Sequence, residues 1–102
     1  MKLYWSPQTR STRALWMLEE IGTPYEREMI DIQRPDRDNP AEFIEASPMG
    51  KVPALVDGNV TLAESAAICL YRADRYATGT LAPAIDDPAR GKFLYWLMYT
   101  PA

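Results

Sequence analysis

A proline stands where an apolar strand should begin, in the segment Met49-Gly50-Lys51-Val52-Pro53-Ala54-Leu55-Val56. Proline cannot donate a hydrogen bond to a strand ladder, so it belongs at the first residue of a strand, at an edge or at a bulge. If the Val52–Pro53 bond is cis, it marks a tight turn. Such a turn leaves the backbone N–H and C=O of Val52 unpaired, and an extended peptide can pair with them as an added strand does.

A second motif, Glu64-Ser65-Ala66-Ala67-Ile68, follows this turn and predicts the start of a helix. The unpaired N–H groups and the positive dipole end of a helix attract carboxylates. The other interpretation is a plain N-cap, because Ser and Glu are favoured there for stability alone. Taken with the upstream Val-Pro turn, the pair of motifs describes a site for a small anionic peptide.

Periodicity along the chain predicts short strands that alternate with helices. Apolar residues at Ala14, Leu18 and Ile21 share one helix face, and Gly22 is a typical helix stop. Asp57-Gly58-Asn59 is a hairpin signal. Asn39 and Pro40 predict an N-cap followed by the first helical residue. The predicted strands are 2–5, 25–32, 52–56 and 60–62, and the predicted helices are 10–21, 40–45 and 65–76.

This order, β-α-β-α-β-β-α, predicts an α/β fold. A crossover helix between the first two strands requires that they pair in parallel, and the hairpin makes the last two antiparallel. We therefore expect a mixed four-stranded sheet flanked by helices.

The C-terminal part differs in composition. Residues 77–87 are typical of a linker, which sets the predicted units at 1–76, 77–87 and 88–102. A helix is expected from Pro88, and the block from Phe93 to Tyr99 is apolar on nearly every face. An exposed patch of this kind marks an interface. The prediction is either dimerisation or domain exchange through 88–102, or a chain that is a fragment of a longer protein.

Bulk composition excludes several classes of function. The net charge of −3 comes from interspersed acids and bases, without the basic stripe of a nucleic-acid-binding protein. No apolar run reaches membrane-spanning length. The chain has no histidine and one cysteine, which argues against a zinc site, a Ser-His-Asp triad or a disulfide. A cytoplasmic location is the default expectation for such a chain.

These motifs together resemble the N-terminal, thioredoxin-like domain of bacterial-type glutathione transferases. Besides the Val-Pro and Glu-Ser motifs, the resemblance rests on Lys2–Pro7, on Arg13–Gly22 and on Pro24–Glu26. It covers residues 1 to about 80 and implies the thioredoxin-like fold. Residues 88–102 would then be the first helix of a truncated all-α domain. The transferase class is not assigned.

The resemblance implies glutathione as co-substrate, with no metal. In that family the serine of the Glu-Ser motif and the start of its helix bind the γ-glutamyl carboxylate. Here that serine is Ser65, and Glu64 would help to hold the same end of glutathione. The backbone of Val52, before Pro53, would bind the cysteinyl part. Lys51 would pair with the glycyl carboxylate, although a loop lysine is usually a solvated charge.

The sequence leaves several candidates for the residue that activates the glutathione thiol. The family uses tyrosine, serine or cysteine near the end of the first strand, and this window contains no cysteine. Thr9 is the first candidate and Ser11 the second, although either hydroxyl could simply cap the helix. Tyr4 is a third, unless strand alternation turns it into the core. Arg10 aligns with the family's cysteine position and could favour the thiolate by charge alone.

Three functions follow as hypotheses. The first is a glutathione-binding transferase domain that joins the thiolate to electrophilic small molecules in detoxification, most simply as a homodimer. The second is a non-catalytic glutathione-binding or interaction module that keeps the fold. The third is a redox protein, which ranks last because Cys69 lies mid-helix, where a free cysteine is usually a packing residue.

Overall fold

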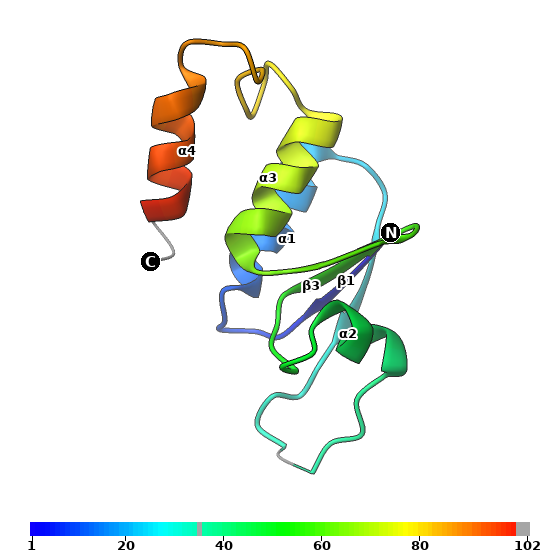
Figure 1. Ribbon diagram of the computed structural model, residues 1–102. Coiled ribbons are helices and arrows are strands. Elements are labelled where there is room, and N and C mark those ends of the chain that lie inside the picture. Colours follow the sequence, from blue (N-terminus) through cyan, green and yellow to red (C-terminus); the bar gives the residue numbers. More distant parts are fainter. Residues whose placement is uncertain (35, 100–102) are drawn as a thin grey trace.

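The computed structural model describes residues 1–34 and 36–99. Its strands and helices follow the predicted order, including the helix expected after the linker (Figure 1). They are β1 (Lys2–Trp5), α1 (Ser11–Ile21), β2 (Glu26–Met29), α2 (Ala41–Ala46), β3 (Ala54–Asp57), β4 (Val60–Ala63), α3 (Ser65–Tyr76) and α4 (Arg90–Tyr99).

The four strands form one sheet in the order β2-β1-β3-β4. β1 pairs with β2 in parallel, and the β1–β3 and β3–β4 pairs are antiparallel, so the mixed sheet expected from the sequence is confirmed. The register places Leu3 opposite Leu55 and Leu55 opposite Leu62. In Figure 1, α1 and α3 lie together on one face of the sheet and α2 lies on the other.

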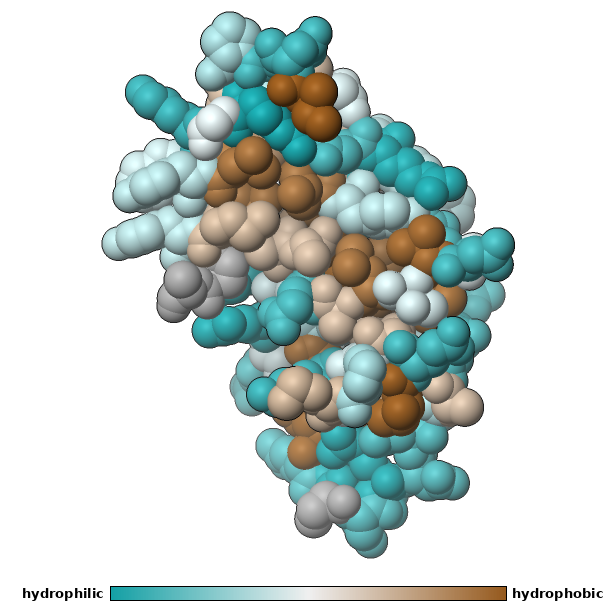
Figure 2. Space-filling view, in the orientation of Figure 1, coloured by the Kyte–Doolittle hydropathy of each residue, from teal (hydrophilic) through white to brown (hydrophobic). Residues whose placement is uncertain are grey.

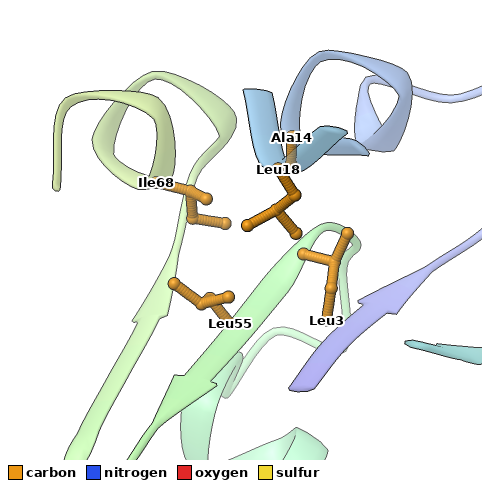
Figure 3. Close-up of a cluster of buried hydrophobic side chains, with 5 residues drawn as sticks. All are labelled: Leu3, Ala14, Leu18, Leu55 and Ile68. Atoms are coloured by element: carbon orange, nitrogen blue, oxygen red, sulfur yellow. The ribbon is translucent and has the colours of Figure 1, made fainter. Parts of the chain in front are cut away.

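Each face of the sheet has its own hydrophobic cluster. Because side chains alternate along a strand, Leu3 and Leu55 point toward α1 and α3, whereas Tyr4 and Ala54 point toward α2. The larger cluster joins both strands to both helices, and its side chains converge in Figure 3. Its buried members are Leu3, Ala14, Leu18, Leu55 and Ile68.

Strand β2 is shorter than predicted. It ends at Met29, whereas the sequence predicted a strand from 25 to 32. The Ile30 N–H still donates to the Trp5 carbonyl at 2.8 Å, but Asp31 then turns the chain, because its carboxylate accepts the N–H of Gln33 at 3.2 Å. An aspartate that bonds its own backbone two residues on is a turn former.

The third strand begins two residues later than predicted, at Ala54, and the Val52–Pro53 bond before it is cis. The predicted hairpin is confirmed. Asp57 faces Val60 across a two-residue turn, in which Gly58 adopts the left-handed φ of 61° that this turn type favours.

The predicted start of α2 is wrong by one position. Pro40 is the N-cap rather than the first helical residue, and the helix starts at Ala41. Asn39 makes no cap because its side-chain carbonyl accepts the Arg37 Nε–H at 2.8 Å. At the end of α1 the expected glycine stop is confirmed, with Gly22 at φ 78° donating its N–H to Leu18.

Helix α4 stands beside α3 rather than on the sheet (Figure 1). It begins at Arg90, two residues after the predicted start, and residues 100–102 of the predicted segment lie outside the described residues. Arg90 binds Asp74 of α3 through two hydrogen bonds of 2.8 and 3.0 Å. None of the residues 90–99 is buried, and Figure 2 shows hydrophobic residues gathered between α4 and α3.

Candidate functional site

The sequence-predicted binding residues lie in one cleft of about 400 Å³. This is the size range of small-molecule sites, which run from about 300 to 1,000 Å³. The N-terminal ends of α1 and α3 lie at the same end of the molecule (Figure 1), where the cleft is found. Its lining residues are Arg10, Ser47, Pro48, Met49, Lys51, Val52, Pro53, Ala63, Glu64 and Ser65.

The turn before β3 presents backbone groups to this cleft. Pro53 is buried and Val52 is half-buried. Within the described residues, neither the N–H nor the C=O of Val52 forms a hydrogen bond of a turn, loop or strand. The expectation that the turn leaves this pair of groups unpaired is therefore confirmed, and the pair can accept a strand-like ligand.

The loop before this turn is held by a serine and an arginine that the sequence analysis did not single out. The Ser47 hydroxyl donates to the Lys51 carbonyl at 2.7 Å and accepts the Lys51 N–H at 3.0 Å. Arg37 donates to the Gly50 carbonyl at 3.0 Å. No spacing signal marks Arg37, because it acts from a loop 13 positions away. These bonds fix Lys51 at the rim of the cleft.

The N-terminal end of α3 is open. Ser65 is the first residue of the helix and is 5% exposed, and α3 has no side-chain cap. The Ile68 N–H donates to the Glu64 carbonyl at 3.0 Å, so the N–H groups of residues 65–67 have no partner within the helix. The described residues include none that bonds the Ser65 hydroxyl. The arrangement suits a carboxylate.

Glu64 has an unusual backbone conformation, with φ 74° and ψ 120°. A positive φ is uncommon for a residue with a side chain. Conformations of this type cost on the order of 1–3 kcal/mol and cluster at functional sites. Glu64 is exposed and lines the cleft, so its strained backbone lies where the ligand would bind.

Three charged side chains line the cleft. Arg10 and Lys51 are positive and Glu64 is negative. Arg10 is the N-cap residue of α1, and its side chain is exposed. The cleft thus offers two cations and one anion, together with the positive ends of two helix dipoles.

The two hydroxyl candidates for thiol activation are engaged in the turn before α1. Thr9 donates its hydroxyl proton to the Ser6 carbonyl at 2.6 Å and accepts the Ser11 N–H at 3.1 Å. The Ser11 hydroxyl accepts the Ser6 N–H at 3.3 Å, and Ser11 is fully buried. Neither residue is among those that line the cleft. Their placement favours a structural role in this turn, although the N-cap itself is Arg10 rather than either hydroxyl residue.

Tyr4 lies on the face of the sheet that is covered by α2, opposite α1 and α3, and it packs against Phe43 of α2. Its hydroxyl donates to the Glu42 carboxylate at 3.1 Å. Burial, followed by this hydrogen bond and the negative charges of Glu42 and Glu28, raises the pKa of Tyr4 to about 12. The position of Tyr4 agrees with the alternative that strand alternation turns it into the core, and it weighs against a role in thiol activation.

Cys69 lies on α3 away from the cleft, and its thiol contacts the Arg13 carbonyl of α1. Burial raises its pKa, against a smaller lowering by Arg13. A half-buried thiol of this kind is a poor nucleophile.

Residues 1–34 and 36–99 contain no cluster of three potential metal ligands. In the same residues, no helix has the length and apolar character needed to cross a membrane.

The four-stranded mixed sheet with two helices on one face, a cis-proline before the third strand and an open helix end beside it define a thioredoxin-like domain with a small-ligand cleft. Comparison with known proteins gives the family. Residues 5–75 match the family model described as the N-terminal domain of glutathione S-transferase.

The chain is similar to a glutathione S-transferase of the fungus Hypomyces subiculosus, with 42% identity over 95 residues, which cover 91% of this chain and 44% of the relative. Among solved structures, it is similar to a sphingomonad glutathione S-transferase complexed with glutathione, with 36% identity and a TM-score of 0.82. That alignment covers 97% of this chain and 50% of the other chain.

A glutathione transferase family member from Pseudomonas fluorescens, solved with two glutathione molecules bound, is 35% identical, with a TM-score of 0.80. The alignment covers 96% of this chain and 44% of that one. The chain therefore belongs to the glutathione S-transferase family, as the sequence resemblance indicated, and it spans about half the length of these relatives or less.

Proposed function

We propose that this chain binds glutathione in the cleft between the Val52 turn and the start of α3. We further propose that it forms the glutathione-binding part of a transferase that acts on electrophilic small molecules. The observation that carries the proposal is that the unpaired backbone of Val52 and the uncapped end of α3 line one cleft. Similar proteins solved with glutathione support the choice of ligand.

The charges of the cleft complement those of the tripeptide. Glutathione carries two carboxylates and one ammonium group, and the cleft offers two cations and one carboxylate. In the proposed pose, Ser65 and the N–H groups of α3 hold the γ-glutamyl carboxylate, and Glu64 holds the ammonium group. The backbone of Val52, before Pro53, pairs with the cysteinyl residue, and Lys51 meets the glycyl carboxylate. This pose places the thiol toward α1.

The proposed reaction is nucleophilic. The thiol gives its proton to solvent, and the thiolate sulfur then forms a bond to an electrophilic carbon while the bond to a leaving group breaks, or while a conjugated double bond takes up the electron pair and then a proton. The protein contributes a larger thiolate fraction and a fixed orientation of the sulfur. Detoxification in the cytoplasm is the proposed setting.

Homodimerisation belongs to the same proposal. The aromatic residues Tyr95, Trp96 and Tyr99 of α4 are exposed and contact one another. An exposed aromatic patch of this kind is typical of an interface. Light scattering of the 102-residue chain would show a dimer, and a monomer at high concentration would contradict this part of the proposal.

The test of the binding site is a residue-resolved titration. Adding glutathione to the isotope-labelled chain should shift the amide signals of Val52 and of residues 65–67. The amides of Leu18 and Phe43, which lie in the two cores, should stay unchanged. Shifts confined to other surfaces, or no shifts, would contradict the proposed site.

A second candidate function is a binding module without transferase activity. It is favoured by the engagement of the Thr9 and Ser11 hydroxyls in the turn and by the burial of Tyr4, because these leave no hydroxyl of the candidate set in the cleft. A chain that binds glutathione but does not raise the thiolate fraction of the bound ligand would be such a module.

A further inference from the structure

The structure narrows the choice of thiol-activating residue by showing what each hydroxyl does. An alcohol has a single proton to donate. Thr9 gives its proton to the Ser6 carbonyl, at 2.6 Å, and Tyr4 gives its proton to Glu42. Ser11 is fully buried and outside the cleft lining. A thiolate in the cleft therefore has to be stabilised by another group.

Arg10 is the cation on the α1 side of the cleft. It is the N-cap of α1, it is exposed, and it lines the cleft together with Val52 and Ser65. The other charged groups facing the cleft are Lys51, in the loop before β3, and Glu64, at the start of α3. Of the two cations, Arg10 belongs to the helix toward which the proposed pose directs the thiol.

We propose that Arg10 stabilises the glutathione thiolate, in place of a hydroxyl donor. This inference rests on the proposed function, because it requires that glutathione occupy the cleft. The thiol proton leaves to solvent, and the guanidinium remains protonated throughout. Arg10 is then a catalytic residue that contacts the reacting sulfur, whereas Thr9 and Ser11 shape the turn that carries it.

The chemistry of a guanidinium suits this role. An arginine side chain stays charged across the range in which a thiol titrates and has five N–H donors. A positive charge within about 4–6 Å lowers the pKa of an acid by about 1–3 pH units. The N-terminal end of α1 adds positive potential at the same position. Both the charge of Arg10 and the dipole of α1 therefore favour the thiolate over the thiol at this position.

The test is a spectroscopic titration of the bound thiol. The ultraviolet absorbance of the thiolate is followed against pH for glutathione bound to the wild-type chain and to Arg10→Gln and Arg10→Lys. We expect Arg10→Gln to raise the pKa of the bound thiol by about one pH unit or more. Arg10→Lys should recover most of that difference because it restores the charge.

Two matched controls separate charge from structure. Lys51→Gln removes a cation from the same cleft, and it should weaken binding while changing the thiol pKa much less than Arg10→Gln does. Tyr4→Phe removes the hydroxyl of a sequence candidate that lies on the α2 face of the sheet, away from the turn that carries Arg10, and it should leave the thiol pKa unchanged. The inference would be overturned if Arg10→Gln left the thiol pKa at the wild-type value, or if Tyr4→Phe raised it.

Binding is measured separately with S-methylglutathione, which has no titratable thiol. Equal affinity of the wild type and Arg10→Gln for this probe, with different thiol pKa values for glutathione, would support the inference. If the wild type did not bind the probe, the proposed function would be overturned, and the inference with it. If the wild type and Arg10→Gln both bound S-methylglutathione and the pKa of the bound glutathione thiol were the same in the two proteins, the inference about Arg10 would be overturned and the proposed function would stand.

Discussion

Two helices begin at the cleft, and their N-terminal ends are built in opposite ways. At α1, the Thr9 hydroxyl accepts the Ser11 N–H, and the Ser11 hydroxyl accepts the N–H of Ser6. At α3, no side chain caps the helix, and the preceding residue, Glu64, has a positive φ. The first end is closed by its own turn, whereas the second is left open.

The difference between the two helix ends supports the proposal that the ligand binds at the start of α3. Unsatisfied N–H groups and a strained residue both cost free energy, so a chain selected for stability alone would pair the first N–H of α3 as Thr9 pairs that of α1. The open end of α3 shares the cleft with Lys51 and the unpaired Val52, and in the proposed site its N–H donors would bind a carboxylate. Arg10 is the N-cap at the closed end and lines the same cleft.

The largest expected effect is on ligand binding at the open end. Ser65→Asp places a negative charge where the γ-glutamyl carboxylate would bind, and it removes a hydroxyl donor. Loss of a hydrogen bond to a charged group costs about 1.5–3 kcal/mol, and charge repulsion adds to it, so glutathione affinity should fall by about 100-fold or more. Equilibrium dialysis measures this loss.

The same substitution has a built-in control for folding. An acidic residue in the first turn of a helix is favourable to the helix. The melting temperature of Ser65→Asp should therefore stay close to that of the wild type. Retained glutathione affinity in a folded variant would show that α3 does not hold the ligand carboxylate.

At the closed end, the expected effect is on stability instead. Thr9→Val removes both hydrogen bonds of the Thr9 hydroxyl while keeping the side-chain shape. Each lost hydrogen bond costs about 0.5–1.5 kcal/mol, so the free energy of unfolding should fall by about 1–2 kcal/mol. Urea unfolding gives the value. A change below experimental error would mean that the turn does not depend on this hydroxyl.

The far end of α3 is anchored through Asp57, whose carboxylate accepts hydrogen bonds from Tyr76 at 2.9 Å and Tyr71 at 3.1 Å. Burial raises the Asp57 pKa, but these bonds and the charges of Arg75 and Arg72 outweigh it, so the pKa lies below 3.8. Asp57→Asn should lower the free energy of unfolding by about 1 kcal/mol at neutral pH.

The pH dependence of this anchor has a definite sign. Because the folded-state pKa is depressed, the stabilisation is fully present above the ordinary aspartate value of 3.8. It is lost as the pH falls through the lower folded value. The difference in unfolding free energy between wild type and Asp57→Asn should therefore shrink below about pH 4. A difference that stays constant from pH 7 to the acid range would contradict the assignment.

The smallest expected effect concerns the strained residue at the open end. Glu64→Gly allows a positive φ without strain, and glycine is tolerated at an N-cap. The free energy of unfolding should rise by roughly 0.5–1 kcal/mol. Glu64→Gln keeps the strain and removes the charge, so its stability should match the wild type. A destabilised Glu64→Gly variant would show that the Glu64 side chain contributes more than its backbone costs.

Signals local to the sequence predicted most of the fold. Gly22 and Gly58 stand where the chain needs a left-handed residue, and Pro53 stands where the third strand cannot yet donate. The two cleft motifs were found for the same reason, because the unpaired backbone groups at Val52 and Ser65 follow from a neighbouring proline and from a helix start.

What the sequence did not predict depends on hydrogen bonds between side chains and loop groups, which no residue spacing marks. Asn39 does not cap α2 as predicted, because its side-chain carbonyl accepts a hydrogen bond from Arg37. Arg37 also donates to the Gly50 carbonyl across a loop. The hydroxyl of Thr9 was a good candidate from its position alone. Only the three-dimensional turn shows that its proton goes to the Ser6 carbonyl.

Calorimetric titration of glutathione into the wild-type chain, Ser65→Ala and Thr9→Val tests the difference between the two helix ends most directly. We predict that the wild type binds, that Ser65→Ala binds about 10-fold more weakly or worse, and that folded Thr9→Val binds as the wild type does. No binding by the wild type, or equal weakening in both variants, would contradict the claim that the open end of α3 holds the ligand carboxylate and that the Thr9 hydroxyl does not bind the ligand.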